Sequence, residues 1–524
     1  MDTVYKPQWI SGRYHKSGKN SKALLYNNLE GMSFLFENES ADIINEIIKY
    51  DFNNPIPINE LVEKSDNSFN KEDIVGFCEE LIDVGILTMS VVNEIVVDRI
   101  REKIREKRRI ESETKNEKTI QEKLPFYISS AENDYSAFIE KDKIPLSVMI
   151  ELTYNCNEKC IHCYNPGASR NIEEKPNRNL FEELNYYDYE RLLRELKDLG
   201  VAKISLTGGE PFVKKDIWKI IELIHQYGFS FEVFTNGILL NEDVDRLLQY
   251  FPHSVKISVY SANEEVHDSI TQVKGSLKKS LTLAKKLQNK GVPIYFNCPI
   301  MKDNLSSYHT VYNLSKEYNA ISQFDVNLID SLDGDIAVSK HLQISNYELE
   351  ILLRDPNIPL YVGKEAPGFG KKTLQKDEPF CGAGINLFNI TPEGYVTPCN
   401  SFPASFGNLK SSSFKEIIFN GIKLEKWQSL KIDSYEECGK YEQCSFCNRC
   451  PGQSFIEHGT PLKKSTANHN LAFVRKNLAD NLKNGYDPLN GLKPFEIFKK
   501  NTFRKKIISS EKNNDNNRNK TLKI

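Results

Sequence analysis

The residues of this chain best suited to hold a metal are its cysteines, and nine of the eleven fall into two groups. The first group is Cys156, Cys160 and Cys163, and the second, about two hundred residues later, is Cys381, Cys399, Cys438, Cys444, Cys447 and Cys450. The N-terminal stretch MDTVYKPQWISGRY lacks the apolar core of a signal peptide. In such a chain, close cysteine spacings are more often metal-binding or redox-active than disulfide-bonded, so we expect metal ligands.

The first group forms a Cys-x3-Cys-x2-Cys loop in LTYNCNEKCIHCYNPG. A structural zinc site normally closes with four ligands, and an electron-transfer iron-sulfur cluster uses four cysteines. Three thiolates therefore indicate a cluster in which one iron stays free to hold something else. The alternative is a zinc site in which His162 joins the three cysteines.

Further polar residues follow other strand-like runs. The segment LTGGEP carries two glycines, which let backbone groups approach a ligand closely, and a glutamate that can accept a bond from an ammonium group. The candidate ligand-binding residues at these positions are Gly208, Gly209, Glu210, Pro211, Asn236 and Ser258. For Asn236 and Ser258, a local bond within their own loops is an equally good interpretation.

The elements that must position these residues alternate between strand and helix. Strand-like runs span 145–152, 202–207, 230–235, 254–260, 292–301 and 323–329, with helical patterns between them. This pattern predicts an α/β fold with a parallel sheet and right-handed crossovers. Six units instead of eight suggest a partial (β/α)6 TIM-like barrel, whose chemistry gathers at the C-terminal strand ends. Cys298 on the fifth strand is interpreted as packing, and Asp330, Asp333 and Asp335 as turn formers.

The first 92 residues have a different pattern. Two short strands are followed by helices near 41–50, 58–65 and 71–87, which suggests a winged helix-turn-helix in which Cys78 is buried. This segment carries 8 Lys/Arg and 15 Asp/Glu, so we expect no nucleic-acid partner. Residues 93–124 are charged with few apolar positions, which predicts a solvated helical linker.

The length and composition limit the classes of protein to which this chain can belong. The chain has 524 residues, 39% hydrophobic and 27% charged, with a net charge of −3, which indicates several globular domains. It contains no apolar run long enough for a spanning helix, and we expect a cytoplasmic protein. From 381 onward regular periodicity fades, so metal coordination should supply the cohesion. Residues 471–524 are basic, and their last part should be disordered.

Taken together, the cysteine loop, the Gly-Gly-Glu-Pro segment and a His-Asp, Ile-Thr, Gly-Ser series resemble the radical S-adenosylmethionine (radical SAM) enzymes. The series comprises His267, Asp268, Ile270, Thr271, Gly275 and Ser276. The resemblance implies a 4Fe-4S cluster on Cys156, Cys160 and Cys163, whose open iron binds the methionine part of S-adenosyl-L-methionine. It also implies that the six rim residues named above line this cosubstrate. His162 departs from the family, which usually has an aromatic residue there.

The second cysteine group resembles the SPASM extension, the auxiliary-cluster domain of peptide-modifying radical enzymes. Its first half, Cys381-x12-Gly394-x4-Cys399, fits closely. Its second half, Cys438-x5-Cys444-x2-Cys447-x2-Cys450, departs from the usual Cys-x2-Cys-x5-Cys-x3-Cys. Six thiolates cannot fully ligate two four-iron clusters, so one or two auxiliary iron-sulfur clusters are expected, and a six-cysteine zinc domain is the alternative.

The resemblance also implies a domain order and a function. The expected segments are a PqqD-like winged-helix leader-recognition domain (1–92), a charged linker (93–143), the partial barrel (144–340), a connector (341–380), the SPASM-like domain (381–470) and a basic tail (471–524). Such an enzyme would modify a ribosomally made precursor peptide with a leader sequence, using a donor such as flavodoxin or ferredoxin. Thioether formation of the sactipeptide or ranthipeptide type is favoured; carbon-carbon crosslinking, epimerisation, formylglycine formation and a non-catalytic zinc-stabilised binding protein are the alternatives.

Overall fold

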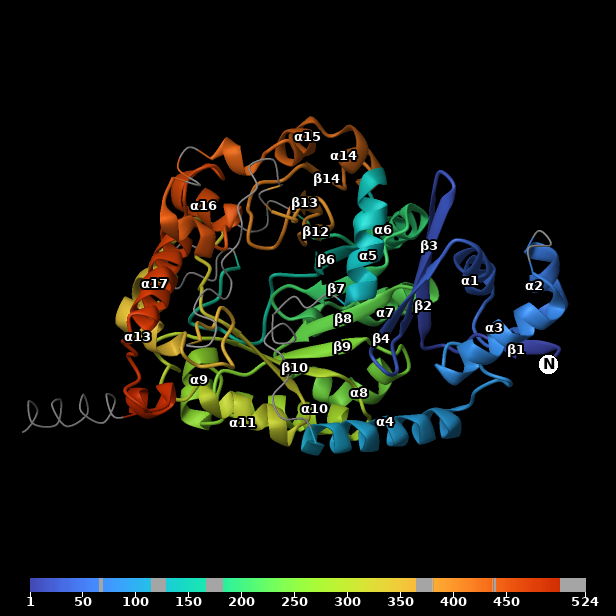
Figure 1. The fold of residues 1–524 in the computed structure, drawn as a ribbon, viewed down its shortest axis with the longest axis horizontal. Helices are drawn as coiled ribbons and strands as arrows, with labels where there is room; N and C mark the ends of the chain where they lie inside the picture. Colours follow the sequence, from blue (N-terminus) through green and yellow to red (C-terminus); the bar gives the residue numbers. More distant parts are fainter. Residues whose placement is uncertain are drawn as a thin grey trace, which may run out of the picture.

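The computed structural model describes residues 1–65, 69–114, 129–165, 182–363, 379, 381–435, 437 and 440–499. Its centre is a nine-stranded sheet in the order β11-β10-β9-β8-β7-β6-β12-β13-β14 (Figure 1). The strands from β6 to β11 are mutually parallel, as the sequence predicts. They are β6 (Ser147–Glu151), β7 (Lys203–Thr207), β8 (Ser230–Thr235), β9 (Ser254–Ser258), β10 (Ile294–Pro299) and β11 (Ile321–Asp325).

Helices between these strands cover the outer face of the sheet. They are α6 (Tyr186–Leu199), α7 (Ile217–Gln226), α8 (Leu240–Leu248), α9 (Glu264–Thr271), α10 (Ser276–Asn289) and α11 (His309–Glu317). Alternate strand residues such as Ile204 and Leu206 point under the helices and form the main core. Cys298 belongs to this core and is fully buried, which confirms its interpretation as a packing residue.

The other face of the strands is polar near their N-terminal ends. Glu232 accepts from Ser205 Oγ at 2.8 Å and pairs with Lys256 Nζ at 3.1 Å and Lys203 Nζ at 3.5 Å. All three charged side chains are enclosed, so each charge depends on the others for stabilisation. Burial opposes ionisation of Glu232, but the two lysines outweigh it and lower its pKa.

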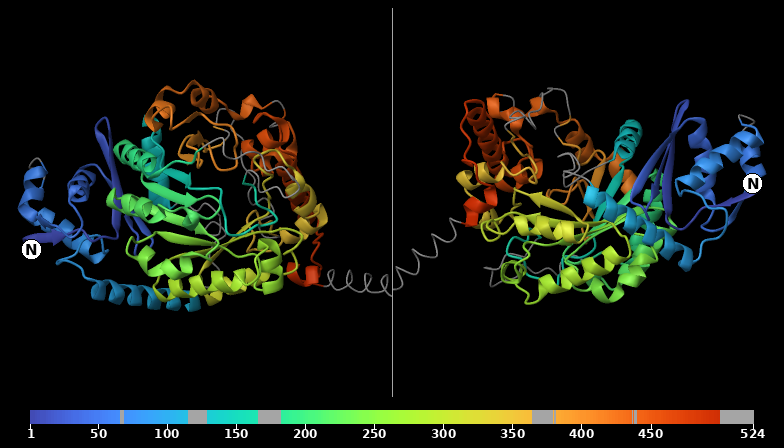
Figure 2. Two further views of the ribbon diagram at one scale, coloured as in Figure 1. Left: turned by 180° about the vertical axis from the view of Figure 1, so that it is seen from behind. Right: turned by 60° about the horizontal axis from the view of Figure 1, so that its bottom comes forward.

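The N-terminal residues form a separate small core beside the barrel (Figure 2). An antiparallel sheet, β2 (Ile10–Ser17), β3 (Asn20–Asn27) and β4 (Met32–Glu37), precedes the helices, and β1 (Thr3–Tyr5) pairs with β5 (Pro55–Pro57). The helices are α1 (Glu39–Lys49), α2 (Ile58–Lys64) and α3 (Lys71–Asp83). The three helices and the burial of Cys78 agree with expectation, whereas β1, β2 and β5 were not expected.

The linker helix α4 (Glu94–Thr114) runs beneath the barrel helices (Figure 1). Arg101 donates to the carbonyl of Leu248 at 2.9 Å and Arg105 to that of Asn289 at 3.1 Å, which are the last residues of α8 and α10. Arg108 donates to Gly291 and, at 2.7 Å, to Glu30 in the N-terminal part. The expectation of a solvated helix was therefore incomplete, because its arginines cap helix ends.

The C-terminal region adds to the barrel sheet instead of forming a separate body. Strand β12 (Leu387–Ile390) pairs in parallel with β6, and β13 (Tyr395–Thr397) and β14 (Gly407–Asn408) follow antiparallel. Gly394, in the turn before β13, has φ of 86°, a left-handed conformation that favours glycine.

The remaining helices are mostly in the C-terminal half of the chain. They are α5 (Ser130–Ile139), which packs between the N-terminal sheet and the barrel, α12 (Ala337–Leu342), α13 (Asn346–Leu352), α14 (Phe414–Asn420), α15 (Ile422–Gln428), α16 (Pro451–His458) and α17 (Thr466–Lys483); the 3-10 turns are η2 (Glu140–Asp142), η4 (Pro211–Val213), η5 (Ile432–Ser434) and η6 (Glu442–Phe446). Helix α17 crosses the expected boundary at 470/471 and buries Leu471 and Leu478, because its apolar residues follow a helical period. The predicted disordered end lies outside the described residues.

Within the described part of the chain, none of the helices combines the length and apolarity that crossing a bilayer requires.

Candidate active site

Cys156, Cys160 and Cys163 lie together in the loop after β6, and their thiols are electrostatic neighbours. The backbone N–H of Glu158 donates to Cys156 Sγ at 3.4 Å, and the hydroxyl of Tyr260 to Cys160 Sγ at 3.9 Å. Burial raises the pKa of Cys156 to about 12. Burial also raises the pKa of Cys160, so a bound metal cation is expected to stabilise the thiolate forms of Cys156 and Cys160.

The Gly208-Gly209 pair lets the end of β7 touch the cysteine loop. Gly209 N donates to Thr153 O at 2.7 Å, and Glu210 N donates to Asn155 O at 3.0 Å. A Cβ on Gly208 would lie 2.4 Å from Thr153 O, and one on Gly209 would lie 2.3 Å from Asn155 O. The two glycines therefore accommodate the backbone of the cysteine loop, while their expected close approach to a ligand stays a prediction.

Glu210 and Asn236 support the same loop. Glu210 is fully buried and accepts from Thr235 Oγ1 and from Asn236 N, both at 2.8 Å. Burial raises its pKa to about 7. Asn236 Nδ2 donates to Asn157 Oδ1 at 2.7 Å and lies 3.8 Å from Cys156 Sγ.

The remaining rim residues stand nearby: Ser258 ends β9, and Pro211 is buried at the start of η4. Direct contacts of all six rim residues with a cosubstrate stay a prediction.

The His-Asp, Gly-Ser series holds the loop from the opposite side. His267 accepts from Tyr260 N at 3.2 Å and bonds Ser276 Oγ at 3.3 Å, while Ser276 donates to Glu158 in the loop. Asp268 accepts from Leu277 N at 3.2 Å and so caps α10. Glu158 and Tyr260 were missed as supporting residues, and Tyr260 also packs edge-on against His162 with ring centroids 4.9 Å apart. Only Glu158's position inside the cysteine loop hinted at its role.

The described cysteines of the second group lie in the C-terminal region of the chain. Cys381, Cys399 and Cys450 are electrostatic neighbours. Ala383 N donates to Cys381 Sγ and Gln453 N to Cys450 Sγ, both at 3.4 Å. Such N–H···S bonds are typical partners of cluster thiolates.

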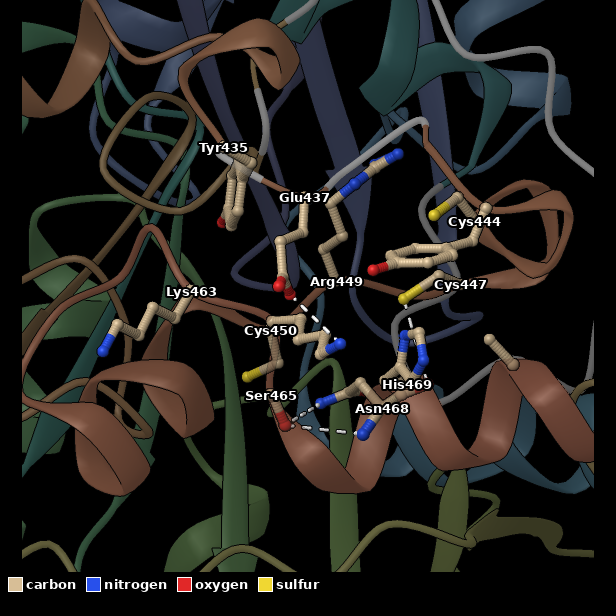
Figure 3. A pocket seen from close by; sticks show the side chains of 13 residues that line it. Tyr435, Glu437, Cys444, Cys447, Arg449, Cys450, Lys463, Ser465, Asn468 and His469 are labelled. Atoms are coloured by element: carbon tan, nitrogen blue, oxygen red, sulfur yellow. Dashed lines mark hydrogen bonds and ion pairs between the residues drawn. The ribbon is translucent and has the colours of Figure 1, made fainter.

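Cys444, Cys447 and Cys450 line one pocket together with His469, Arg449 and Lys463 (Figure 3). Cys438 lies outside the described residues.

The two cysteine groups meet at one rim because β12 lies next to β6. Asn400, which follows Cys399, donates to the hydroxyl of Tyr164, which follows Cys163, at 2.7 Å. Asn389 on β12 donates to Glu151 on β6 at 2.9 Å. The two cysteine regions, about two hundred residues apart in the sequence, are therefore joined by direct hydrogen bonds.

The donor set fits an iron-sulfur cluster, because three neighbouring cysteine thiols on one loop supply soft sulfur ligands and leave one iron position open. Among the described side chains, no group of three His, Cys, Asp or Glu residues is arranged as a metal-ion site. Cys156, Cys160 and Cys163 would hold the cosubstrate cluster, which when loaded supplies one-electron chemistry.

Comparisons with known proteins support this assignment. Residues 150–314 match the radical SAM superfamily, and residues 381–451 match the iron-sulfur cluster-binding domain called SPASM. The chain is 28% identical over 324 residues, 59% of this chain and 67% of the relative, to the antilisterial bacteriocin subtilosin biosynthesis protein AlbA of Bacillus subtilis (strain 168).

A second relative has a different described activity. The AdoMet-dependent heme synthase of Methanosarcina barkeri (strain Fusaro / DSM 804) is 25% identical over 61% of this chain and 95% of its own length. The crystal structure of SuiB from Streptococcus suis matches 88% of this chain and 99% of its own with a TM-score of 0.51 at 16% identity, which concerns the fold alone.

The matched segments define two domains in this chain, a radical SAM domain over residues 150–314 and a SPASM domain over residues 381–451. The radical SAM domain binds a 4Fe-4S cluster and S-adenosylmethionine, and the SPASM domain binds auxiliary iron-sulfur clusters.

Proposed function

We propose that this enzyme modifies a ribosomally made precursor peptide and that the modification is a cysteine thioether crosslink. The observation that carries the proposal is the shared rim, where the Tyr164–Asn400 bond joins the two metal-binding loops at 2.7 Å. A peptide held there would face the cosubstrate on one side and an electron acceptor on the other. The similarity to a subtilosin biosynthesis protein supports this choice of substrate class.

The N-terminal domain supplies a surface for the leader of the precursor. In the register of β3 and β4, Phe36 faces Ala23 and Phe34 faces Leu25. Because Asn38 N donates to Ser21 O, the alternating pattern directs the backbone N–H groups of Ser33 and Leu35 away from β3. An extended leader would pair with this edge.

Side chains beside the edge offer apolar contacts for the leader. Phe36 on β4 and Phe77 on α3 meet edge to face at 6.0 Å. The net acidity of residues 1–92 suits a leader that carries lysines.

When loaded, the cluster held by Cys156, Cys160 and Cys163 would take one electron from a donor such as flavodoxin or ferredoxin and would supply, with S-adenosylmethionine, the chemistry that removes one hydrogen atom from a peptide carbon. The S–H bond of a peptide cysteine would break with loss of its proton, and the sulfur would bond to that carbon. The one surplus electron would pass to an auxiliary cluster. The protein's own contribution is to position the peptide and exclude water.

The test is anaerobic incubation of the reconstituted enzyme with S-adenosylmethionine, a reductant and a cysteine-containing precursor peptide. Mass spectrometry should show the loss of two hydrogens per crosslink with disappearance of free thiols, together with 5'-deoxyadenosine. Deuterium uptake without mass loss would indicate epimerisation instead. Free thiols retained after full turnover would contradict the thioether assignment.

A further inference from the structure

Asp325 is the last residue of β11, and its side chain faces the interior of the barrel. Its neighbour Phe324 is 1% exposed in the core under the helices, and successive strand residues face opposite sides. Asp325 is solvent-accessible, although the surrounding protein raises the pKa of its carboxyl group by burial. Unlike Glu232, it has no ion pair with a cation in the part of the chain that the structure describes.

The loop that follows β11 fixes Asp325 between the two metal-binding regions. Asn327 N donates to Asp325 Oδ1 at 2.9 Å, and Asn327 Nδ2 donates to Asn468 Oδ1 at 3.0 Å. Asn468 in turn accepts from Cys447 Sγ through its carbonyl at 3.8 Å. The carboxylate is therefore positioned by a residue that is itself bonded to the auxiliary domain.

The same loop also contacts both neighbouring cysteine regions. Leu332 N donates to the carbonyl of Tyr164, next to the cosubstrate cysteine loop, at 3.0 Å. Gln453 donates to Asp330 at 2.9 Å, and Asp325 is an electrostatic neighbour of Cys450. Asp325 thus stands where the barrel rim faces the auxiliary cysteines, which is where the proposed function places the reacting peptide.

Other acidic residues of this region are already engaged. Glu210 and Glu151 are fully enclosed behind the cysteine loop and the β6–β12 contact. Asp330 is buried against Gln453, and Asp335 caps the start of α12 by accepting from Ala337 N at 2.9 Å. Among these acidic residues, Asp325 is the one that is both exposed to solvent and held by a backbone N–H donor, that of Asn327.

We propose that Asp325 is the catalytic base that accepts the thiol proton of the substrate cysteine, an inference that rests on the proposed function. The S–H bond breaks heterolytically and its proton passes to the Asp325 carboxylate. The thiolate sulfur then bonds to the carbon radical left by hydrogen abstraction. The one surplus electron passes to an oxidised auxiliary iron-sulfur cluster, so that proton acceptor and electron acceptor are neighbours.

The experiment compares Asp325→Asn with the wild-type holoenzyme on the cysteine peptide. We expect 5'-deoxyadenosine to form while the crosslinking rate falls about 10²–10⁴-fold, the range of a lost general base. Iron content and the electron paramagnetic resonance spectra of the clusters should match those of the wild type, which shows that the variant is folded and loaded. Asp335→Asn is the matched control and should crosslink normally.

A peptide with selenocysteine in place of cysteine separates a base from a positioning residue. A selenol is already ionised at neutral pH, so this peptide should restore crosslinking in Asp325→Asn. Unchanged crosslinking of the cysteine peptide, loss of 5'-deoxyadenosine, or no rescue by selenocysteine would each overturn the assignment. Failure of the wild-type enzyme to crosslink the peptide would instead contradict the proposed function.

Discussion

Gly209 illustrates how closely single residues are constrained around the cysteine loop. An added Cβ would lie 2.3 Å from Asn155 O and 2.7 Å from Tyr154 O, and neither backbone atom is free to yield like the end of a flexible side chain. The loop that carries Cys156 would have to shift.

We therefore predict that Gly209→Ala lowers the iron bound at the cosubstrate site and abolishes 5'-deoxyadenosine formation. Iron per chain and chromatography of the nucleoside measure both effects. Gly76→Ala is the matched control, because nothing lies within 4 Å of a Cβ at this position in α3; its stability should change by no more than about 1 kcal/mol. Full iron content in Gly209→Ala would refute the steric argument.

Glu151 gives a pH-dependent prediction. Burial raises its folded pKa to about 7, above the value of about 4.3 expected in the unfolded chain. Between these values the folded state binds more protons than the unfolded state, so the Glu151 contribution to stability falls as pH rises and stays low above the folded pKa.

The apo-protein of Glu151→Gln should therefore match the wild type near pH 5 and exceed its unfolding free energy near pH 8 by about 3 kcal/mol. Urea unfolding of both proteins at the two pH values measures the difference. An equal difference in unfolding free energy between the two proteins at pH 5 and pH 8 would show that the pKa of Glu151 is the same in the folded and unfolded states.

At the scale of elements, helix C-termini on the barrel underside receive arginines from the N-terminal third of the chain. Arg13 is enclosed and donates to Val201 O and Gly228 O at 2.8 Å and to Tyr227 O at 3.0 Å. Its guanidinium also lies 4.3 Å from the Phe229 ring centroid. These carbonyls follow α6 and α7, where a cation is favoured.

Arg13→Ala should lower the unfolding free energy by about 3 kcal/mol or more, since it leaves buried carbonyls without donors. Urea unfolding and limited proteolysis of the N-terminal domain measure this loss. Arg194→Ala provides the control, because Arg194 is exposed and its contacts are the ion pair with Glu190 at 3.5 Å and a bond to the Tyr227 side chain; its unfolding curve should not change. Equal behaviour of the two variants would mean that Arg13 does not hold the domains together.

At the scale of the whole molecule, the N-terminal domain, which we propose binds the leader, and the C-terminal cysteine region lie on different sides of the barrel (Figure 1). Tyr26 in β3 donates to Glu132 in α5 at 2.9 Å, and α5 packs Tyr135 and Ile139 into the contact with the barrel. Deleting residues 1–92 would uncover Tyr135 and Ile139. A point substitution on the β4 edge is therefore a sharper test of leader recognition.

We predict that Ser33→Pro weakens binding of a labelled leader peptide at least tenfold, because it removes an edge N–H without disturbing the β3–β4 pairs. Ser33→Ala is the control: it loses only the contact of Ser33 Oγ with Ser129 Oγ and keeps the N–H. Fluorescence anisotropy measures binding, and 5'-deoxyadenosine formed without peptide should be equal in both variants. Equal leader binding by both variants would place the leader elsewhere.

Local patterns in the sequence determine much of this protein. Period-2 and period-3.6 apolar positions predict the six parallel strands and their helices, because each element must bury one face. The Cys-x3-Cys-x2-Cys loop and the Gly-Gly-Glu-Pro segment predict the cosubstrate region, because each motif lies within a few consecutive residues and can be read directly from the sequence. Cys78 and Cys298 are correctly separated from the ligands by their apolar surroundings.

Only the tertiary structure decides which distant segments meet. Strand β12 is too short and too isolated in the sequence to be assigned to the barrel sheet, yet its pairing with β6 brings Asn400 to Tyr164. The charge pattern of α4 shows many arginines but not the helix ends that they cap. The sequence places Asp325 inside the expected strand 323–329, and only the fold puts it at the end of β11, between two metal-binding regions. Such contacts depend on long-range packing, which no local spacing encodes.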